Sequence, residues 1–282
     1  MQTPRDAWAD ELQAAIGAGY VLDGEIGRGG MATVYRARDV AGARDVAIKV
    51  LHQAFGVGVE TERFLREIEL ASRLTHPRIL PLLNSGRVAE VPFFVMPFVD
   101  GETLTQRLQR DGALTVADSV AITGDMLDAL GYAHQLGVIH RDIKPDNIML
   151  SDGHALVTDF GIGKALNGDQ VALTQTGMAL GTPAYMSLEQ AAGDPDLDLR
   201  SDLYSTALVL YEMLSGATPF TGNTPQAVIA ARFVQKVRPL AGTIPGIGPA
   251  LDAVLLRALA QRRDDRFASA LEFSDALRAA IG

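Results

Sequence analysis

The stretch HRDIKPDNI, residues 140–148, decides the interpretation of this chain, together with TDFG at residues 158–161. The two strings place two carboxylates and an amide, Asp142, Asp159 and Asn147, close together in sequence. Asn147 and Asp159 carry hard oxygen donors, which suit magnesium because that ion prefers one or two carboxylates together with phosphate oxygens. A lone aspartate is often only a turn cap. Because Asp142 and Asp159 stand within these complete strings, a role as a turn cap alone does not explain them.

Outward from these strings, towards the N-terminus, Lys49 closes the strand-like run VAIK. A lysine that points from a strand into the interior needs a compensating anion. Glu67 and Glu69 both lie on the next predicted helix, which ends before Pro77. Its apolar face comprises Phe64, Leu65, Ile68, Ala71 and Leu74. We favour Glu67 as the partner because it shares a face with Phe64 and Ala71, although an isolated lysine or glutamate is usually a solvated surface charge.

Further outward, residues 26–35 read IGRGGMATVY. Gly27 and Gly29 lack a Cβ, so the backbone there can approach phosphate oxygens closely. The pattern also fits a dinucleotide-binding turn, but that fold needs a helix directly after the glycines and an acidic residue about twenty positions later. Here Thr33, Val34 and Tyr35 favour a strand. We therefore predict a strand–turn–strand lid over phosphates, with an ordinary glycine hairpin as the alternative if the motif stood alone.

The motifs, in this order, resemble those of the eukaryotic-type (Hanks-type) serine/threonine protein kinases of bacteria, from Gly27 to about Arg266. The resemblance implies an α+β, bilobal fold. The small N-lobe, about residues 20–98, would hold an antiparallel sheet and one helix. The larger C-lobe, about residues 99–282, would be mainly α-helical. Residues 1–19 are expected to form an N-terminal helical extension. The implied activity is transfer of the γ-phosphoryl of Mg-ATP to serine and threonine hydroxyls of proteins.

The resemblance also gives each residue of the central strings a role. Asp142 would accept or orient the proton of the substrate hydroxyl. Lys144 would steady the γ-phosphate, a feature of serine/threonine rather than tyrosine kinases. Asn147 and Asp159 would ligate Mg²⁺, with Mn²⁺ as an alternative ion. Lys49, paired with Glu67, would hold the α- and β-phosphates.

An adenine pocket is implied by FFVMPFVDGETL, residues 93–104, which resembles the kinase hinge. Met96 would gate the back of the pocket, and adenine would contact the carbonyl of Pro97 and the amide of Val99. Pro97 lacks an N–H but keeps that carbonyl. A plain hydrophobic strand end is the simpler alternative. The full set of expected nucleotide contacts is Ile26, Gly27, Gly29, Val34, Ala47, Lys49, Met96, Pro97 and Val99.

The segment between Asp159 and Glu189 contains a threonine pair, Thr174 and Thr176. The resemblance implies that this pair is autophosphorylated, unless TQT is merely a polar loop. Arg141 would then pair with the phosphothreonine and order the segment. Thr182 is expected on the ledge that docks the substrate.

Three charged residues are expected to support the larger lobe. Glu189 would form a buried ion pair, for which Arg266 is the candidate. Asp202 would accept backbone N–H bonds from the catalytic loop, or would simply be an acid at a helix N-terminus. The chain departs from the family pattern twice, with Ala32 in place of the third glycine and Leu188 in place of the proline before Glu189.

Hydrophobic periodicity gives the expected elements. A first helix over residues 6–17 has Trp8, Leu12, Ala15 and Ile16 at helical spacing. Short strand-like runs follow, including two around Leu80–Val88 and Phe93–Met96. Further helices are predicted over residues 116–136, 201–215, 225–236, 249–260 and 269–280.

Composition sets limits on partners. The 282 residues are 48% hydrophobic and carry a formal net charge of −9, which argues against a nucleic-acid partner. The chain has no cysteine, so it has no disulfide or thiolate metal site, as in a reducing cytoplasm. No apolar run is long enough to span a bilayer, so no membrane contact is expected in this chain. A cytoplasmic location is predicted, and an anchor beyond Gly282 is left open. Analogy with related kinases suggests a weak homodimer.

Three rival functions are weighed against the kinase interpretation. A pseudokinase would generally lose Lys49, Asp142 or Asp159, and all three are present. A small-molecule phosphotransferase would not be expected to combine the threonine pair, the GTPAY string of residues 181–185 with its expected substrate ledge, and Glu189. A nicotinamide-dependent dehydrogenase fails on the pattern after the glycines. Physiological substrates, the activating signal and the role of the first helix cannot be inferred from the sequence.

Overall fold

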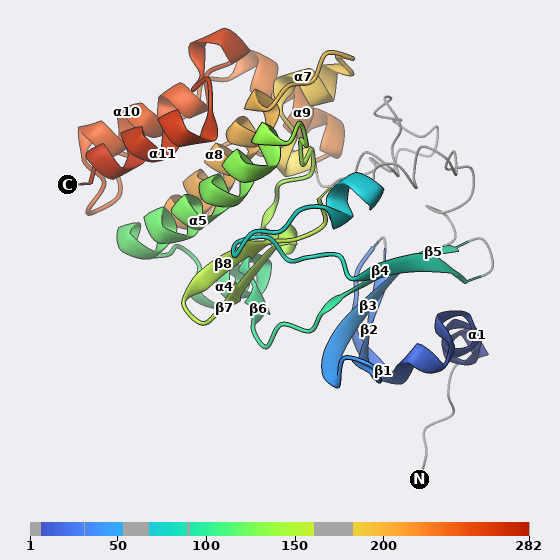
Figure 1. The fold of residues 1–282 in the computed structure, drawn as a ribbon. Coiled ribbons are helices and arrows are strands. Elements are labelled where there is room, and N and C mark those ends of the chain that lie inside the picture. Colours follow the sequence, from blue (N-terminus) through green and yellow to red (C-terminus); the bar gives the residue numbers. More distant parts are fainter. Residues whose placement is uncertain (1–6, 31, 53–67, 89–90, 161–182, 282) are drawn as a thin grey trace. The chain divides into compact units, whose positions relative to one another are not determined.

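The computed structural model describes residues 7–30, 32–52, 68–88, 91–160 and 183–281. It divides into two compact units (Figure 1). The first comprises Met1–Thr75 and Leu80–Asp100, and the second comprises His76–Ile79 and Gly101–Gly282. The first unit is built on a β-sheet and the second is mainly helical. The predicted α+β class, with a small β-rich lobe before a larger helical lobe, is confirmed.

The small lobe contains a five-stranded antiparallel sheet in the order β1-β2-β3-β5-β4. Its strands are β1 (Tyr20–Arg28), β2 (Ala32–Asp39), β3 (Arg44–Leu51), β4 (Asn84–Val88) and β5 (Val91–Pro97). The central strands carry the core, because Val46, Ile48, Phe94 and Val95 are fully buried. The predicted run around Leu80–Val88 becomes a strand only from Asn84. Pro81 precedes that start and has no N–H to give to a ladder.

The N-terminal helix α1 (Ala7–Ile16) packs on β1 and β4, followed by the 3-10 turn η1 (Gly17–Gly19). Gln13 joins the helix to the sheet: its Nε2 donates to the Tyr20 carbonyl at 2.8 Å and its Oε1 accepts from Leu22 N at 2.9 Å. Leu12 and Ile16 are buried as the predicted face requires, but Ala15 is exposed. Ala15 was wrongly placed on that face. The side chain of Trp8 lies outside the described residues.

The helix predicted before Pro77 is described only from residue 68. Ile68, Ala71 and Leu74 are buried, as that prediction requires. Glu69 points to solvent and pairs with Arg73 at 2.6 Å. Phe64, Leu65 and Glu67 lie outside the described residues.

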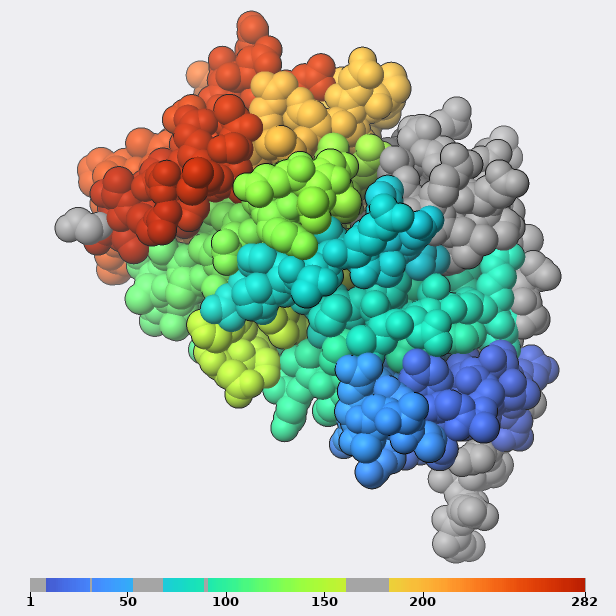
Figure 2. Space-filling view, in the orientation of Figure 1, coloured from blue at the N-terminus to red at the C-terminus, as the bar shows by residue number. Residues whose placement is uncertain are grey.

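The larger lobe is organised around α8, a helix buried along nearly its whole length. A helix that is buried on all sides needs other elements around it. Helix α8 contacts α5 and α10, and α5 also contacts α11 and the strand β8 (His154–Val157). Figure 2 shows α10 and α11, in red, forming one continuous surface of this lobe. Its helices are α4 (Leu104–Asp111), α5 (Val116–Gln135), α7 (Leu188–Ala192), α8 (Arg200–Ser215), α9 (Pro225–Val234), α10 (Pro249–Ala258) and α11 (Ala270–Ala279).

Short elements complete the larger lobe. A three-stranded sheet consists of β6 (Glu102–Thr103), β7 (Ile148–Ser151) and β8 (His154–Val157). The 3-10 turns are η2 (Pro145–Asn147), η3 (Pro183–Tyr185) and η4 (Arg263–Asp265). In the described ranges, no helix has both the length and the apolar character needed to cross a bilayer.

Candidate active site

The loop that carries HRD, between α5 and β7, is anchored by one buried carboxylate. Asp202, in the first turn of α8, is fully buried and accepts the backbone N–H groups of His140 and Arg141, each at 2.8 Å. The ring of His134 adds a contact of 2.8 Å from Nε2. Burial would raise the pKa of Asp202, but the hydrogen bond from His134 and the backbone donor of Arg141 outweigh burial and lower it. The carboxylate is therefore stable as an anion in the core.

One residue of each string has a strained backbone. Arg141 has φ of 67° and Asp159 has φ of 65°, both in the left-handed region that non-glycine residues rarely adopt. Such residues cost free energy and persist only where the surroundings hold them. The Asp202 contacts hold the first of them. The strain accompanies the two strings that the sequence singles out.

Asp142 is held through one oxygen of its carboxylate. Its Oδ2 accepts from Lys144 Nζ at 2.7 Å and from Asn147 Nδ2 at 3.0 Å, and the same Nδ2 lies 2.7 Å from the Asp142 carbonyl oxygen. Lys144 and Asn147 are themselves buried. Oδ1 of Asp142 has no hydrogen-bond partner among the residues that the structure describes. The arrangement fixes the carboxylate and leaves one oxygen able to accept a proton.

His140 links this loop to the TDF segment. Its ring is fully buried, with Nε2 2.7 Å from the Thr158 carbonyl and Nδ1 3.2 Å from Asp142 N. A carbonyl can only accept, so the proton sits on Nε2 and Nδ1 accepts. Thr158 N also donates to the Asn147 carbonyl at 2.9 Å. The structure thus brings Asp142, Asn147 and the residue before Asp159 together through hydrogen bonds.

The donor chemistry of the loop fits magnesium. Because the amide nitrogen of Asn147 faces Asp142, its amide oxygen remains for another ligand. That oxygen and the Asp159 carboxylate are the type of ligand that Mg²⁺ takes when phosphate oxygens complete its shell. Within the described ranges no group of three or more His, Asp or Glu side chains could hold a metal.

Glu189 and Arg266 form a buried two-pronged ion pair, with distances of 2.7 and 3.0 Å. Arg266 is 2% exposed, and its remaining donors reach the Ala260, Arg200 and Gln261 carbonyls. Burial would raise the pKa of Glu189, but the hydrogen bond from Arg266 outweighs it and lowers the pKa. A buried pair with its hydrogen bonds satisfied in this way keeps both charges.

Helix α7 begins at Leu188, the position where the family pattern has proline. Proline favours this first helical position because its missing N–H would be unsatisfied there anyway, so leucine is compatible with it. The capping box of Ser187 and Gln190 starts the helix without proline. Gln190 Nε2 also donates to the Arg141 carbonyl at 2.6 Å, which ties α7 to the loop that carries Asp142.

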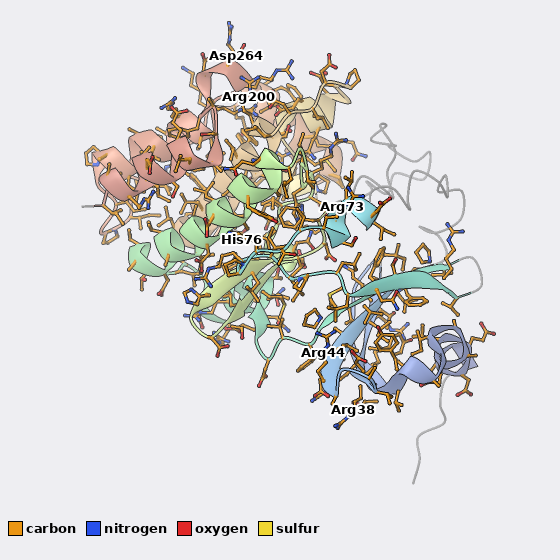
Figure 3. All side chains as sticks on the ribbon, viewed as in Figure 1. Arg38, Arg44, Arg73, His76, Arg200 and Asp264 are labelled. Atoms are coloured by element: carbon orange, nitrogen blue, oxygen red, sulfur yellow. The ribbon has the colours of Figure 1, made fainter. Side chains whose placement is uncertain are left out.

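Three carboxylate contacts in the larger lobe were not predicted from the sequence. Tyr185 donates its hydroxyl to Glu212 Oε2 at 2.6 Å. Burial raises the pKa of both groups, and the nearby charge of Asp146 raises both further. Arg200, one residue before Ser201, pairs with Asp198 at 2.7 Å and Asp264 at 2.8 Å (Figure 3). No local pattern marks the Tyr185–Glu212 pair, 27 residues apart, or the Arg200–Asp264 pair, 64 residues apart. Asp198, in contrast, lies only two residues before Arg200.

In the small lobe, register places several of the expected nucleotide contacts on one face of the sheet. Gly27 faces Val34, Val34 faces Lys49, and Ala47 faces Met96. Directly paired residues share a face of the sheet, as do residues two apart on a strand, so Val34, Ala47, Lys49 and Met96 lie on the same side. The other expected contacts lie on β1 (Ile26), just beyond β1 (Gly29), at the end of β5 (Pro97) and after it (Val99).

Several expected site residues are not described: Glu67, Thr174, Thr176 and Thr182 all fall outside the described residues. Arg141, the expected partner of a phosphothreonine, has its Nε buried and without a hydrogen-bond partner in the described part of the chain.

Residues 20–266 match the family model described as "Protein kinase domain". The chain is 38% identical over 271 residues to a "Probable serine/threonine-protein kinase PknB" of Bifidobacterium longum, covering 92% of this chain and 39% of that relative. It is 40% identical over 270 residues to "Serine/threonine-protein kinase PknB" of Mycobacterium leprae (93% of this chain, 43% of the relative), and 40% identical over 259 residues to the Mycobacterium tuberculosis protein of that name (90% and 41%). The chain thus spans about two fifths of the length of these relatives.

Proposed function

We propose that this chain transfers the γ-phosphoryl group of Mg-ATP to serine and threonine hydroxyls of proteins. The premise is that the chain belongs to the protein kinase family, as a catalytic domain of the eukaryotic-type bacterial serine/threonine kinases. The observation that carries the proposal is the Asp142 carboxylate, fixed through Oδ2 by Lys144 and Asn147 on a loop anchored by Asp202. The kinase domain would comprise residues 20–282, with lobes of about 20–98 and 99–282.

Asp142 would orient the acceptor hydroxyl and take its proton at Oδ1, because Oδ2 is already engaged. Lys144 is buried beside it and would steady the γ-phosphate. Phosphoryl transfer through a loose transition state needs positioning and charge neutralisation more than covalent chemistry from the protein. The loop provides positioning through its anchor.

Asn147 and Asp159 would hold Mg²⁺, or Mn²⁺ in its place, because both supply oxygen ligands. The bound ion would neutralise charge on the phosphates of ATP. Lys49 would hold the α- and β-phosphates with Glu67 as its partner, and Val34, Ala47 and Met96 would enclose the base from the face of the sheet they share with Lys49.

Transfer of radiolabelled phosphate from ATP to a generic basic protein tests this proposal. Asp142→Asn keeps the shape and removes the base, so its rate is expected to fall at least about 100-fold. Asp152→Asn, in an exposed turn with φ of 51°, is the matched control and should leave the rate unchanged. Full activity in Asp142→Asn, or transfer to sugars or antibiotics in preference to protein, would contradict the proposal.

Regulation by phosphorylation of Thr174 and Thr176 extends the proposal. Among the described residues, the Nε of Arg141 is buried and has no hydrogen-bond partner, which supports this extension because a guanidinium pairs strongly with phosphate. Replacing both threonines with alanine is expected to lower activity about tenfold or more, measured after preincubation with Mg-ATP. Unchanged specific activity would reject this part alone.

A further inference from the structure

The tip of the β1–β2 hairpin has little support from the sheet itself. Its last strand pairs are Gly27 with Val34 and Arg28 with Thr33, and Gly29 N then bonds the Ala32 carbonyl at 2.9 Å. Gly29 and Gly30 beyond these pairs are exposed. Glycine loses more conformational freedom on ordering than other residues. A glycine tip therefore keeps one position only if something outside the hairpin holds it.

His52 provides such a hold from the neighbouring strand. It follows Leu51, the last residue of β3, and lies three positions after Lys49. Its Nδ1 is 3.1 Å from the Gly30 carbonyl oxygen, and its Nε2 is 3.1 Å from the Thr33 hydroxyl. The imidazole therefore spans from the tip of the hairpin to its first pairing residue on β2.

Hydrogen-bond chemistry fixes the tautomer. The Gly30 carbonyl can only accept, so Nδ1 carries the proton and Nε2 accepts from the Thr33 hydroxyl. Thr33 is 4% exposed, and a buried hydroxyl needs a partner. One imidazole thus satisfies both groups and uses both of its ring nitrogens.

We propose that His52 is a positioning residue that fixes the glycine-rich hairpin relative to the Lys49 strand and so strengthens binding of the ATP phosphates. The inference rests on the proposed function. Holding the tip before the nucleotide arrives reduces the ordering cost of binding. An interaction that serves ground state and transition state equally changes KM rather than kcat. The effect should therefore appear in nucleotide affinity.

The test uses calorimetric titration of this chain with Mg²⁺ and a non-hydrolysable ATP analogue, with steady-state kinetics beside it. His52→Ala is expected to raise Kd and the KM for ATP about three- to tenfold, the range of one or two lost hydrogen bonds. The kcat and the KM for the protein substrate should stay within about twofold. Arg38→Ala is the matched control: Arg38 is an exposed residue on the same strand as Thr33, and its side chain points away from the ribbon in Figure 3.

Two further variants keep the proposal testable should His52→Ala fail to fold. His52→Asn retains a donor near the Nδ1 position and should recover most of the affinity. Thr33→Val removes only the hydroxyl and should weaken nucleotide binding about two- to threefold. In combination with His52→Ala, its effect should be less than additive because the two residues contact each other.

The outcomes separate the inference from the function on which it rests. If the wild type binds the analogue and the Kd values of the His52 and Thr33 variants lie within twofold of the wild-type Kd, the positioning role is wrong while the kinase proposal stands. Equal increases in the KM for ATP and in the KM for the protein substrate would likewise overturn the positioning role, because they would indicate general damage to the domain. If the wild type binds no nucleotide, the proposed function fails and this inference fails with it.

Discussion

The two ends of helix α8 carry carboxylates in opposite electrostatic states. Asp202, in the first turn, is fully buried, yet its pKa is lowered. Glu212, near the last turn, is only partly buried, yet its pKa is raised. Burial pushes both values upward. The deeper group is the one that stays more acidic.

The number of donors and the position on the helix account for the difference. Asp202 accepts two backbone N–H groups and a ring nitrogen, whereas Glu212 accepts one tyrosine hydroxyl and feels the charge of Asp146. The helix dipole favours an anion at the N-terminus and disfavours one at the C-terminus. The N-terminal end of α8 is thus suited to a permanent negative charge, and that charge holds the loop that carries Asp142.

Removal of the anchor should have the largest effect. Asp202→Ala leaves the N–H groups of His140 and Arg141 buried without an acceptor, at about 1–3 kcal/mol each. We expect a loss of about 4 kcal/mol in the free energy of unfolding, measured with urea, and at least a 100-fold loss of kinase activity. Asp128→Ala, an exposed aspartate on α5 near His76, is the control. A variant with wild-type activity would show that the anchor is dispensable.

A third carboxylate tests the donor rule away from α8. Arg266→Met removes the partner of Glu189 and leaves its charge buried, at a cost of about 3–4 kcal/mol. The pKa of Glu189 should then rise, so that it resembles Glu212. Arg278→Met, which breaks an exposed pair with Asp275, should be near neutral. Adding Glu189→Gln to Arg266→Met should recover part of the loss; no recovery would argue against an unpaired charge as its cause.

The smallest expected effect has the opposite sign. A carboxyl whose folded-state pKa lies above its unfolded value of 4.5 destabilises the fold when ionised. Glu212→Gln keeps an acceptor for Tyr185 without the charge, so Tm should rise by about 1–3 °C at pH 7–8. The difference in Tm between Glu212→Gln and the wild type should close as the pH falls through the folded-state pKa of Glu212 towards 4.5. A gap independent of pH would mean that the ionised carboxylate is not the cause.

The long elements of the fold were predictable from the sequence. The helices predicted over residues 116–136 and 201–215 are α5 and α8, because apolar residues recur over several turns in each. The strands β6, β7 and β8 have two to four residues and α7 has five, too few for a period to appear. Ala15 was misplaced because a small apolar residue at helical spacing can face either way.

The strings that carry Asp142 and Asp159 stand out because their residue types and spacing are unusual. The contacts that hold them do not. His134 and Asp202 are 68 residues apart, and Gln190 reaches the Arg141 carbonyl over 49 residues. A glutamine or histidine of this kind has no local mark, since its role depends on which backbone groups the tertiary fold leaves unpaired. His52 is a further case, visible only from the path of the hairpin.

Mass spectrometry of the dephosphorylated chain after incubation with Mg-ATP tests the central claim most directly. The wild type is expected to gain phosphate on threonine or serine, including Thr174 or Thr176, while Asp142→Asn, incubated alone, gains none. An unmodified wild type, or an Asp142→Asn variant phosphorylated to the same extent, would contradict the assignment of Asp142 as the base of a protein kinase.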